Sequence, residues 1–347
     1  MSAIRVRGFA LPHGEPVDLF ADRDRWTTDP VPGADVVAEG WLLPGLVDAH
    51  THPGAEAPGD PLDHDLLREH LHQHVDAGVT AIRSPGLADD PPAWFGTDPD
   101  VPRAWHAGPW LAQQDQFFEG WGRRPAHADL PAVAAAQAKR TGWAKIIGDW
   151  GVGDDVVPLD VLTAVVAAVH EVGGRVAVHS QQADGGAVAV AAGVDSVEHG
   201  MCLDPALLND MAARGTVLTP TLATLQNSLE AVRKREDSPR KRWYVEGASA
   251  HAGLVAAAAE AGVLVLAGTD SVPHGRILDE VRALAAAGLR PHDAPAAASW
   301  SAREYLGLAG LVPGAPADAV VYEEDPRTDL DQLAAPAAVI LRGRRVR

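Results

Sequence analysis

Two histidines, His50 and His52, end an apolar run of the chain with one residue between them. Successive side chains of a β-strand point to opposite faces, so this spacing sends both imidazoles to the same side. Imidazole is the commonest protein metal ligand near neutral pH. On its own, the pair fits a polar patch on a solvated strand as well as it fits a metal site. Matching ligands at the ends of other strands would favour the metal.

Later apolar runs also carry polar side chains at or near their ends. Lys145 lies within Ala-Lys-Ile-Ile, His179 follows Val-Ala-Val, His199 follows Ser-Val-Glu, and Asp270 closes a run that starts at Val263. Each has an ordinary explanation when taken alone: a core histidine, a helix cap, or a lysine whose stem extends toward water. Together with the opening pair they make four histidines and one aspartate, a ligand set suited to zinc or a similar divalent ion.

A repeating pattern of strand, loop and helix connects these residues. Strands are expected to start near residues 41, 78, 103, 143, 175, 195, 216 and 263. Helices are expected at residues 66–75, 132–140, 159–171, 185–192, 205–214, 242–261, 277–287 and 294–306. This alternation predicts an α/β fold, a (β/α)8 TIM barrel over residues 41–306. Strand carboxyl ends surround one mouth of such a barrel, so the six polar residues are expected to converge there.

The first helix and the chain ends carry further expectations. The segment 63–75 holds His64, His70, His72 and His74, which are expected to form a solvated face outside the barrel. Residues 1–40 and 307–347 have β character and are expected to form one small β-sandwich domain from both chain ends.

Composition restricts the class of protein. A formal net charge of −18 argues against nucleic acid as a partner, because phosphate binding needs a basic surface. The single cysteine, Cys202, excludes an intrachain disulfide framework and fits a reducing compartment. Neither a secretory signal nor an apolar run of about 18 residues is visible. We expect a cytoplasmic enzyme with a small-molecule partner and no membrane contact. A homo-oligomer is compatible with the sequence.

Three motifs resemble those of the amidohydrolase superfamily: Pro-Gly-Leu-Val-Asp-Ala-His-Thr-His ending at His52, Ser-Val-Glu-His-Gly around His199, and Gly-Thr-Asp ending at Asp270. The resemblance runs from Pro44 to about Arg347. Within the superfamily, Lys145 resembles the strand-four lysine of a branch in which CO2 carboxylates that lysine and the product bridges two metals. Metal-dependent prolidases belong to this branch, and imidazolonepropionase is a mononuclear relative.

The resemblance implies a role for each ligand. His50 and His52 would bind one metal together with Asp270, His179 and His199 would bind the other, and carboxylated Lys145 would bridge the two ions, expected to be zinc. It implies hydrolysis of an amide C–N bond in a dipeptide, an N-acyl amino acid or a cyclic amide by a metal-bridging hydroxide. The implied catalytic residues are Asp270, as general base and acid, with Lys145 and His199.

Substrate contacts are less closely matched. Arg83 is followed by Ser84 where the family often has aspartate, and Gln181 stands where acyl-amino-acid hydrolases often have tyrosine. We expect Arg83, Gln181 and His274 to contact substrate, with packing at the barrel mouth as the alternative for Arg83 and orientation of the site as the alternative for His274. The aromatic segment 110–121 either lines an apolar pocket or covers the barrel.

Other functions remain open at this level. One is a mononuclear deaminase or cyclic-amidine hydrolase, and another is an inactive family member that serves as a binding or scaffold protein. Lys145 argues against the first, and the complete ligand set argues against the second.

Overall fold

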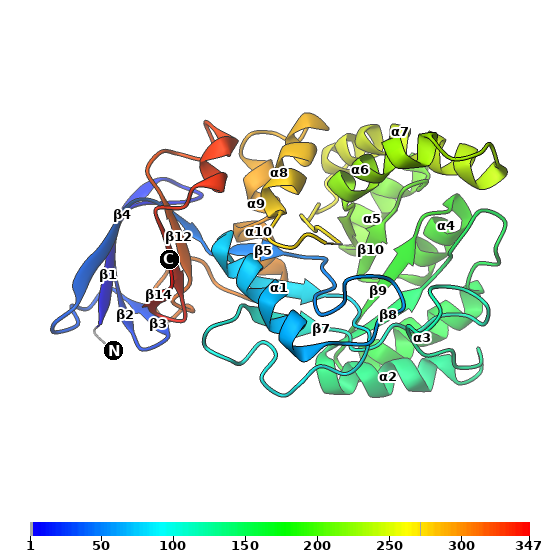
Figure 1. Cartoon of the computed structure of the whole chain (residues 1–347), viewed down its shortest axis with the longest axis horizontal. Helices are drawn as coiled ribbons and strands as arrows, with labels where there is room; N and C mark the ends of the chain where they lie inside the picture. Colours follow the sequence, from blue (N-terminus) through cyan, green and yellow to red (C-terminus); the bar gives the residue numbers. More distant parts are fainter. Residues whose placement is uncertain (1–2, 271) are drawn as a thin grey trace.

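The computed structural model describes residues 3–270 and 272–347. A β-rich part built from both chain ends adjoins a larger part of alternating strands and helices (Figure 1). The α/β class predicted from the sequence is therefore confirmed. None of the helices in these residues is long and apolar enough to cross a lipid bilayer.

The β-rich part is one seven-stranded sheet in the order β14-β13-β12-β4-β1-β2-β3. Its strands are β1 (Ile4–Ala10), β2 (Glu15–Asp22), β3 (Arg25–Thr27), β4 (Asp35–Pro44), β12 (Ala319–Tyr322), β13 (Ala338–Leu341) and β14 (Arg344–Arg345). β4 lies between parallel β1 and antiparallel β12, so it joins the two chain ends. Because β4 runs to Pro44, residues 41–44 belong to this sheet and not to the first barrel strand expected from the sequence.

The larger part contains two parallel sheets, β5-β6-β7 and β8-β9-β10-β11. The strands are β5 (Leu46–Asp48), β6 (Val79–Ser84), β7 (Arg103–His106), β8 (Trp143–Ile147), β9 (Arg175–Ser180), β10 (Ser196–His199) and β11 (Val217–Thr219). An isolated parallel bridge between His106 and Gly142 connects the two sheets. Two further bridges connect the segment after residue 263 to Leu218 on one side and to Thr51 on the other. That segment pairs only through these bridges and is not a regular strand, unlike the eighth strand expected.

Helices follow the strands and pack around them (Figure 1). They are α1 (His64–Asp76), α2 (Leu130–Thr141), α3 (Leu159–Glu171), α4 (Ala183–Ala192), η1 (Pro205–Leu207), α5 (Leu208–Arg214), α6 (Leu222–Arg233), α7 (Pro239–Glu260), α8 (Ile277–Ala286), α9 (Asp293–Ala297), α10 (Trp300–Tyr305) and η2 (Leu330–Ala334). α6 was not expected, and the helix expected at 294–306 is divided into α9 and α10. Asp63 caps α1 as its sequence position indicates, accepting hydrogen bonds from two backbone amides.

The histidines of α1 correct one expectation. His70 and His74 are buried and pack against the rest of the fold, although the sequence favoured a solvated surface. His70 Nδ1 accepts a hydrogen bond from the Gly54 amide at 3.1 Å, and its ring lies 4.2 Å from that of His274. His74 Nε2 lies 3.2 Å from Thr51 Oγ1, beside the strand end that carries the His-x-His pair.

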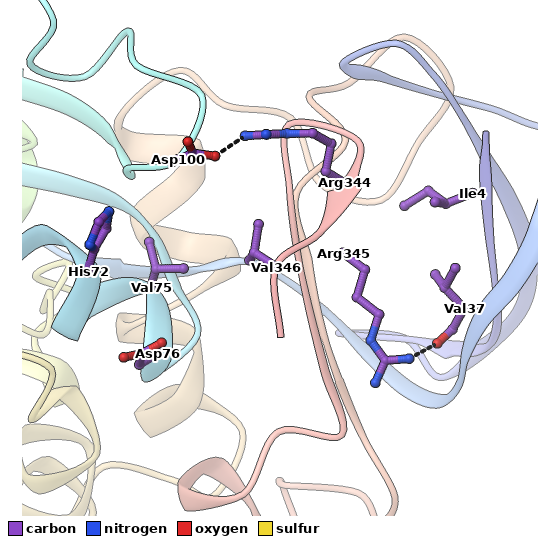
Figure 2. A pocket seen from close by; sticks show the side chains of 9 residues that line it. All are labelled: Ile4, Val37, His72, Val75, Asp76, Asp100, Arg344, Arg345 and Val346. Atoms are coloured by element: carbon purple, nitrogen blue, oxygen red, sulfur yellow. Dashed lines mark hydrogen bonds and ion pairs between the residues drawn. The ribbon is translucent and has the colours of Figure 1, made fainter. Parts of the chain in front are cut away.

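Ion pairs join the two parts of the chain. Asp318, which precedes β12, is buried and binds Arg103 of β7 and Arg303 of α10. An open groove lies between the parts, where Arg344 reaches Asp100 at 2.8 Å and Arg345 donates to the Val37 carbonyl at 2.7 Å (Figure 2). Both guanidinium groups are thus occupied within the chain.

Candidate metal centre and active site

One cavity of about 260 Å³ opens where the parallel strands end. All six ligands predicted from the sequence line it: His50, His52, Lys145, His179, His199 and Asp270. They come from four parallel strands or their C-terminal ends and from the segment that pairs with Thr51. The structure therefore brings together the residues that the sequence places at separate strand ends.

His50, His52 and Asp270 form the tightest group. The two Nε2 atoms lie 3.0 Å apart, and Asp270 Oδ1 lies 3.3 and 3.4 Å from them. His50 Nδ1 donates to Glu198 and His52 Nδ1 donates to the Gly86 carbonyl, each at 2.6 Å. A neutral imidazole that donates through Nδ1 presents a lone pair at Nε2. Two lone pairs and a carboxylate facing one point fit a bound cation.

Lys145, His179 and His199 lie on the other side of the cavity. Lys145 Nζ and His179 Nε2 are both buried without a hydrogen-bond partner among the described residues. Burial lowers the pKa of Lys145 to about 8 and that of His179 to about 3. His199 Nδ1 is held at 2.7 Å from Thr221 Oγ1. Unpartnered buried nitrogens are costly, and their neutral forms are suited to receive a metal or, at Lys145, CO2.

Backbone geometry at the strand ends is strained. His199 and Asp270 both have a φ of 65°, a left-handed conformation that is uncommon outside glycine. Such strain is typically retained where the surrounding structure aims a functional side chain. Gly268 allows the close approach that this needs, because a Cβ there would lie 2.5 Å from His50 Cβ. The Gly-Thr-Asp motif thus positions Asp270 against the first histidine.

The charge balance holds Asp270 ionised. Burial alone would raise the pKa of Asp270, but the neighbouring imidazoles of His50 and His52 outweigh it and hold the pKa well below the usual value. Burial in turn lowers the pKa of His52, so this imidazole stays neutral near pH 7. The group therefore offers an anionic carboxylate at Asp270 and a neutral imidazole at His52.

Arg83 has a different place from the one expected. Its side chain is fully buried and does not line the cavity. It makes two 2.9 Å hydrogen bonds to Glu198, one to the Ala49 carbonyl at 2.7 Å and one to Thr219 at 3.0 Å. The expectation that Arg83 contacts substrate is wrong for this geometry. It neutralises Glu198, which orients His50.

His274 also lies away from the cavity. It is buried, and its Nδ1 lies 3.0 Å from Thr51 Oγ1, so it packs behind the metal ligands and does not line the substrate space. Gln181 does line the cavity, and its backbone amide is fixed by Asp149 at 2.9 Å. Of the three expected substrate contacts, only Gln181 occupies a position that reaches substrate.

The aromatic segment lines the cavity. Trp110, Phe117, Phe118 and Trp121 are joined there by Trp150, which follows β8. The Trp110 ring lies 5.1 Å from His52, and the Trp150 ring lies 5.4 Å from His179.

Sequence reasoning assigned no role to several residues around the site. Glu198 lies in the Ser-Val-Glu-His-Gly motif, directly before His199 on the same strand, and this position was the signal that could have identified it. Trp150, Glu56 and Arg240 line the cavity from loops or a helix start, where no periodic pattern identified them.

Comparisons with known proteins identify the family of this chain. The amidohydrolase family model matches residues 113–346. Uncharacterized proteins of Mycobacterium tuberculosis and Mycobacterium bovis are 39% identical over 355 residues, which covers 98% of this chain and 95% of theirs.

Solved structures share the fold. A Xaa-Pro dipeptidase with bound methionine has a TM-score of 0.81 at 20% identity and covers 99% of both chains. A prolidase complexed with N-methylphosphonate-L-proline has a TM-score of 0.83 at 21% identity, with full coverage of both chains at 100%. Ochratoxinase of A. niger has a TM-score of 0.80 at 18% identity and covers 99% of this chain and 95% of its own. By its family match, the chain belongs to the amidohydrolases, hydrolases that act on amide carbon–nitrogen bonds.

Proposed function

We propose that this protein hydrolyses the amide bond of a dipeptide, an N-acyl amino acid or a cyclic amide, with two divalent metal ions held by the six cavity residues. One observation carries the proposal. The lone pairs of His50 and His52 converge on Asp270, and the unpartnered Lys145 and His179 nitrogens line the same cavity.

The buried, unpartnered amine of Lys145 supports the two-metal form, because such an amine can be converted to a carbamate. With a pKa lowered to about 8 by burial, a fraction of the Lys145 amine is neutral near pH 7. The neutral nitrogen forms a bond to the carbon of CO2 and releases a proton, which leaves an anionic carbamate with two oxygen donors. His50, His52 and Asp270 would hold one ion, His179 and His199 the other, and the carbamate oxygens would bridge them.

The bound ions would supply a water of lowered pKa and polarise the scissile carbonyl. Asp270 is ionised, so its carboxylate accepts the proton of the attacking water and delivers it to the departing nitrogen. Glu198 and the Gly86 carbonyl hold the two imidazoles in the tautomer that leaves Nε2 free. The aromatic residues exclude bulk water from the reacting bond.

A one-metal alternative, as in a mononuclear deaminase, rests on a specific observation. His50, His52 and Asp270 have donor atoms within 4.8 Å of one another, which makes them a sufficient three-ligand site by themselves. In that form, the unpartnered nitrogens of Lys145 and His179 would have no role. Metal stoichiometry separates the two forms.

Metal analysis with the variant Lys145→Ala tests the proposal. The wild type should hold about two equivalents of zinc and lose amide hydrolysis on chelation. Lys145→Ala should retain one equivalent and lose activity, because the bridge is removed. Lys139→Ala, at an exposed lysine of α2, is the matched control and should behave as wild type. Full activity in Lys145→Ala would contradict the bridging role, and a single equivalent in the active wild type would favour the one-metal form.

The finer architecture belongs to the same proposal. We infer that the parallel strands from β5 onward close into a (β/α)8 barrel that extends to residue 306. The bridges of His106, Leu218 and Thr51, which connect its sheets in cyclic order, support this closure. Residues 1–40 and 307–347 would form the sandwich-like small domain, in a reducing cytoplasmic setting.

A further inference from the structure

The cavity beside the metal ligands has two chemically distinct regions. One is an aromatic wall, defined here as Trp110, Phe117, Phe118, Trp121 and Trp150. The other is its charged rim, where Glu56 and Arg240 stand on separate elements. The wall and the rim can therefore select the substituents of an amide bound at the ligands.

The aromatic wall is built as a rigid surface. Trp110 and Trp121 stack at 4.7 Å with an interplanar angle of 17°, and Phe118 meets the Trp150 edge at 4.8 Å. Gly86 makes room for Trp110, since a Cβ there would lie 2.1 Å from the indole nitrogen. The rings are thus in place before any ligand arrives, which reduces the entropy lost on binding.

Hydrogen bonds fix the segment that carries these rings. The Arg124 guanidinium donates to the carbonyls of Gln116, Phe118 and Trp121, each at 3.0 Å. Trp121 Nε1 donates to the Asp60 carbonyl at 2.6 Å, so the wall is anchored to the loop that follows His52.

Arg240 is the cation of the rim. Its neighbours on the same stretch are engaged, because Lys234 pairs with Glu230 and Arg242 pairs with Asp237. Arg240 is exposed and makes no ion pair with the described residues. A Cβ at Gly151 would lie 3.8 Å from Arg240 Cζ and 2.8 Å from Asp154 Oδ2, which places the guanidinium beside the loop after Trp150. The Arg240 guanidinium can donate two parallel hydrogen bonds to a carboxylate.

We propose that the site selects amides that carry both an aromatic group, packed on the aromatic wall, and a free carboxylate, paired with Arg240. The inference rests on the proposed function and names its substrate class. Glu56 would repel that carboxylate from its own side of the rim, which leaves Arg240 as the attractive side. An N-arylacyl amino acid has both features.

Matched substrates test the two halves separately. N-phenylacetyl-L-alanine, N-acetyl-L-alanine and N-phenylacetyl-L-alaninamide share one scissile bond type, and the released acid is quantified in each case. The metal-loaded wild type should prefer the first compound over both others. Phe118→Ala, at a ring that is 36% exposed, should reduce the phenylacetyl-over-acetyl preference about 5- to 10-fold.

Arg240→Gln should reduce the carboxylate-over-carboxamide preference about 10-fold and leave the phenylacetyl preference intact. Arg235→Gln, an exposed arginine that does not line the cavity, is the control and should keep both preferences. Equal effects of Arg240→Gln and Arg235→Gln would overturn the carboxylate assignment. A wild type that hydrolyses amides without preference for phenylacetyl would overturn the wall assignment.

Equilibrium binding separates this inference from the proposed reaction. The probe is N-(2-phenylethyl)-L-alanine, in which CH2 replaces the scissile carbonyl. Its binding is measured by the quenching of tryptophan fluorescence. Binding that Arg240→Gln and Phe118→Ala each weaken, without amide turnover in the wild type, would keep the specificity and reject the hydrolytic function. Amide turnover in the wild type with unchanged probe binding in both variants would keep the hydrolytic function and reject the specificity.

Discussion

At the scale of single residues, the buried pair of Glu198 and Arg83 determines how His50 presents its lone pair. Both side chains are fully buried, and Glu198 accepts hydrogen bonds from His50 and Arg83 together. Burial alone would raise the pKa of Glu198, but the Arg83 charge holds it well below its usual range. The carboxylate is therefore a permanent acceptor for His50 Nδ1–H, which fixes the imidazole tautomer.

Glu198→Gln should weaken both folding and metal binding. It leaves the Arg83 guanidinium buried without its carboxylate, a loss of about 3–5 kcal/mol in the free energy of unfolding, measured by urea denaturation. Metal affinity, measured by competition with a chromogenic chelator, should fall about 10- to 100-fold.

A double variant separates these two effects. Arg83→Met with Glu198→Leu removes both charges, so stability should recover relative to Glu198→Gln while metal affinity stays low. Recovery of both properties would show that Glu198 acts on stability alone and does not orient His50.

The ligand residues could be predicted at this scale because each stands at the end of an apolar run. The partner of Arg83 could not, because Glu198 lies 115 positions away in the sequence and meets Arg83 only in the folded interior, between strands of two different sheets. Arg240 and Trp150 were missed because they lie at a helix start and in a loop. No local sequence periodicity predicts which strand ends such residues will face.

At the scale of elements, the start of α6 is coupled to the predicted metal ligand His199. Glu280 of α8 accepts hydrogen bonds from the Leu222 and Ala223 amides at 2.9 and 2.7 Å. Thr221, directly before α6, has a φ of 48° and binds His199 Nδ1. A helix two elements further along the chain thus holds the turn that orients His199.

Glu280→Gln should change how stability depends on pH. Burial raises the pKa of Glu280 from 4.5 to about 8, so between these values the folded protein keeps a proton that the unfolded chain releases. The free energy of unfolding therefore falls as pH rises through this window, by up to about 1.4 kcal/mol per pH unit. Glutamine cannot titrate, so the decline should be smaller in the variant.

Urea unfolding of the metal-free protein at several pH values between 5 and 8 measures this slope. Asp279→Asn, at a partly exposed neighbour on α8, serves as the control and should keep the wild-type slope. An unchanged slope in Glu280→Gln would assign the pH dependence to other groups.

Most helices and strands could be predicted from periodicity and caps, and α3 coincides with the predicted residues. α6 was missed because its apolar positions directly follow the β11 pattern and its first turn is capped by a distant side chain, Glu280, instead of by a local residue. The inward face of α1 was missed because imidazoles pair with one another and with Thr51, contacts that a polarity pattern does not reveal.

At the scale of the whole molecule, Asp318 holds the β-rich part to the helical part. It is 1% exposed and binds Arg103, Arg303 and the Arg342 amide. The Arg303 side chain is also buried, so both partners depend on this carboxylate for neutralisation.

Asp318→Ala should destabilise the protein by about 3–5 kcal/mol, because two arginines lose their buried partner. Asp100→Ala removes an exposed pair with Arg344 at the same junction and should cost less than about 1 kcal/mol. Thermal unfolding of both variants provides the comparison. Similar shifts in the two would show that the buried network contributes no more than the exposed pair.

The bridge between Thr51 and Asp270 has a consequence for biosynthesis. The ribosome delivers both histidines of the tightest ligand group early, but their carboxylate partner emerges only after 220 further residues, from position 50 to position 270. A chain interrupted before that point carries imidazoles without the charge that completes the group. In the proposed metal site, loading would therefore follow synthesis of the last parallel segment, because a chain truncated before Asp270 lacks one of the three donors of this group.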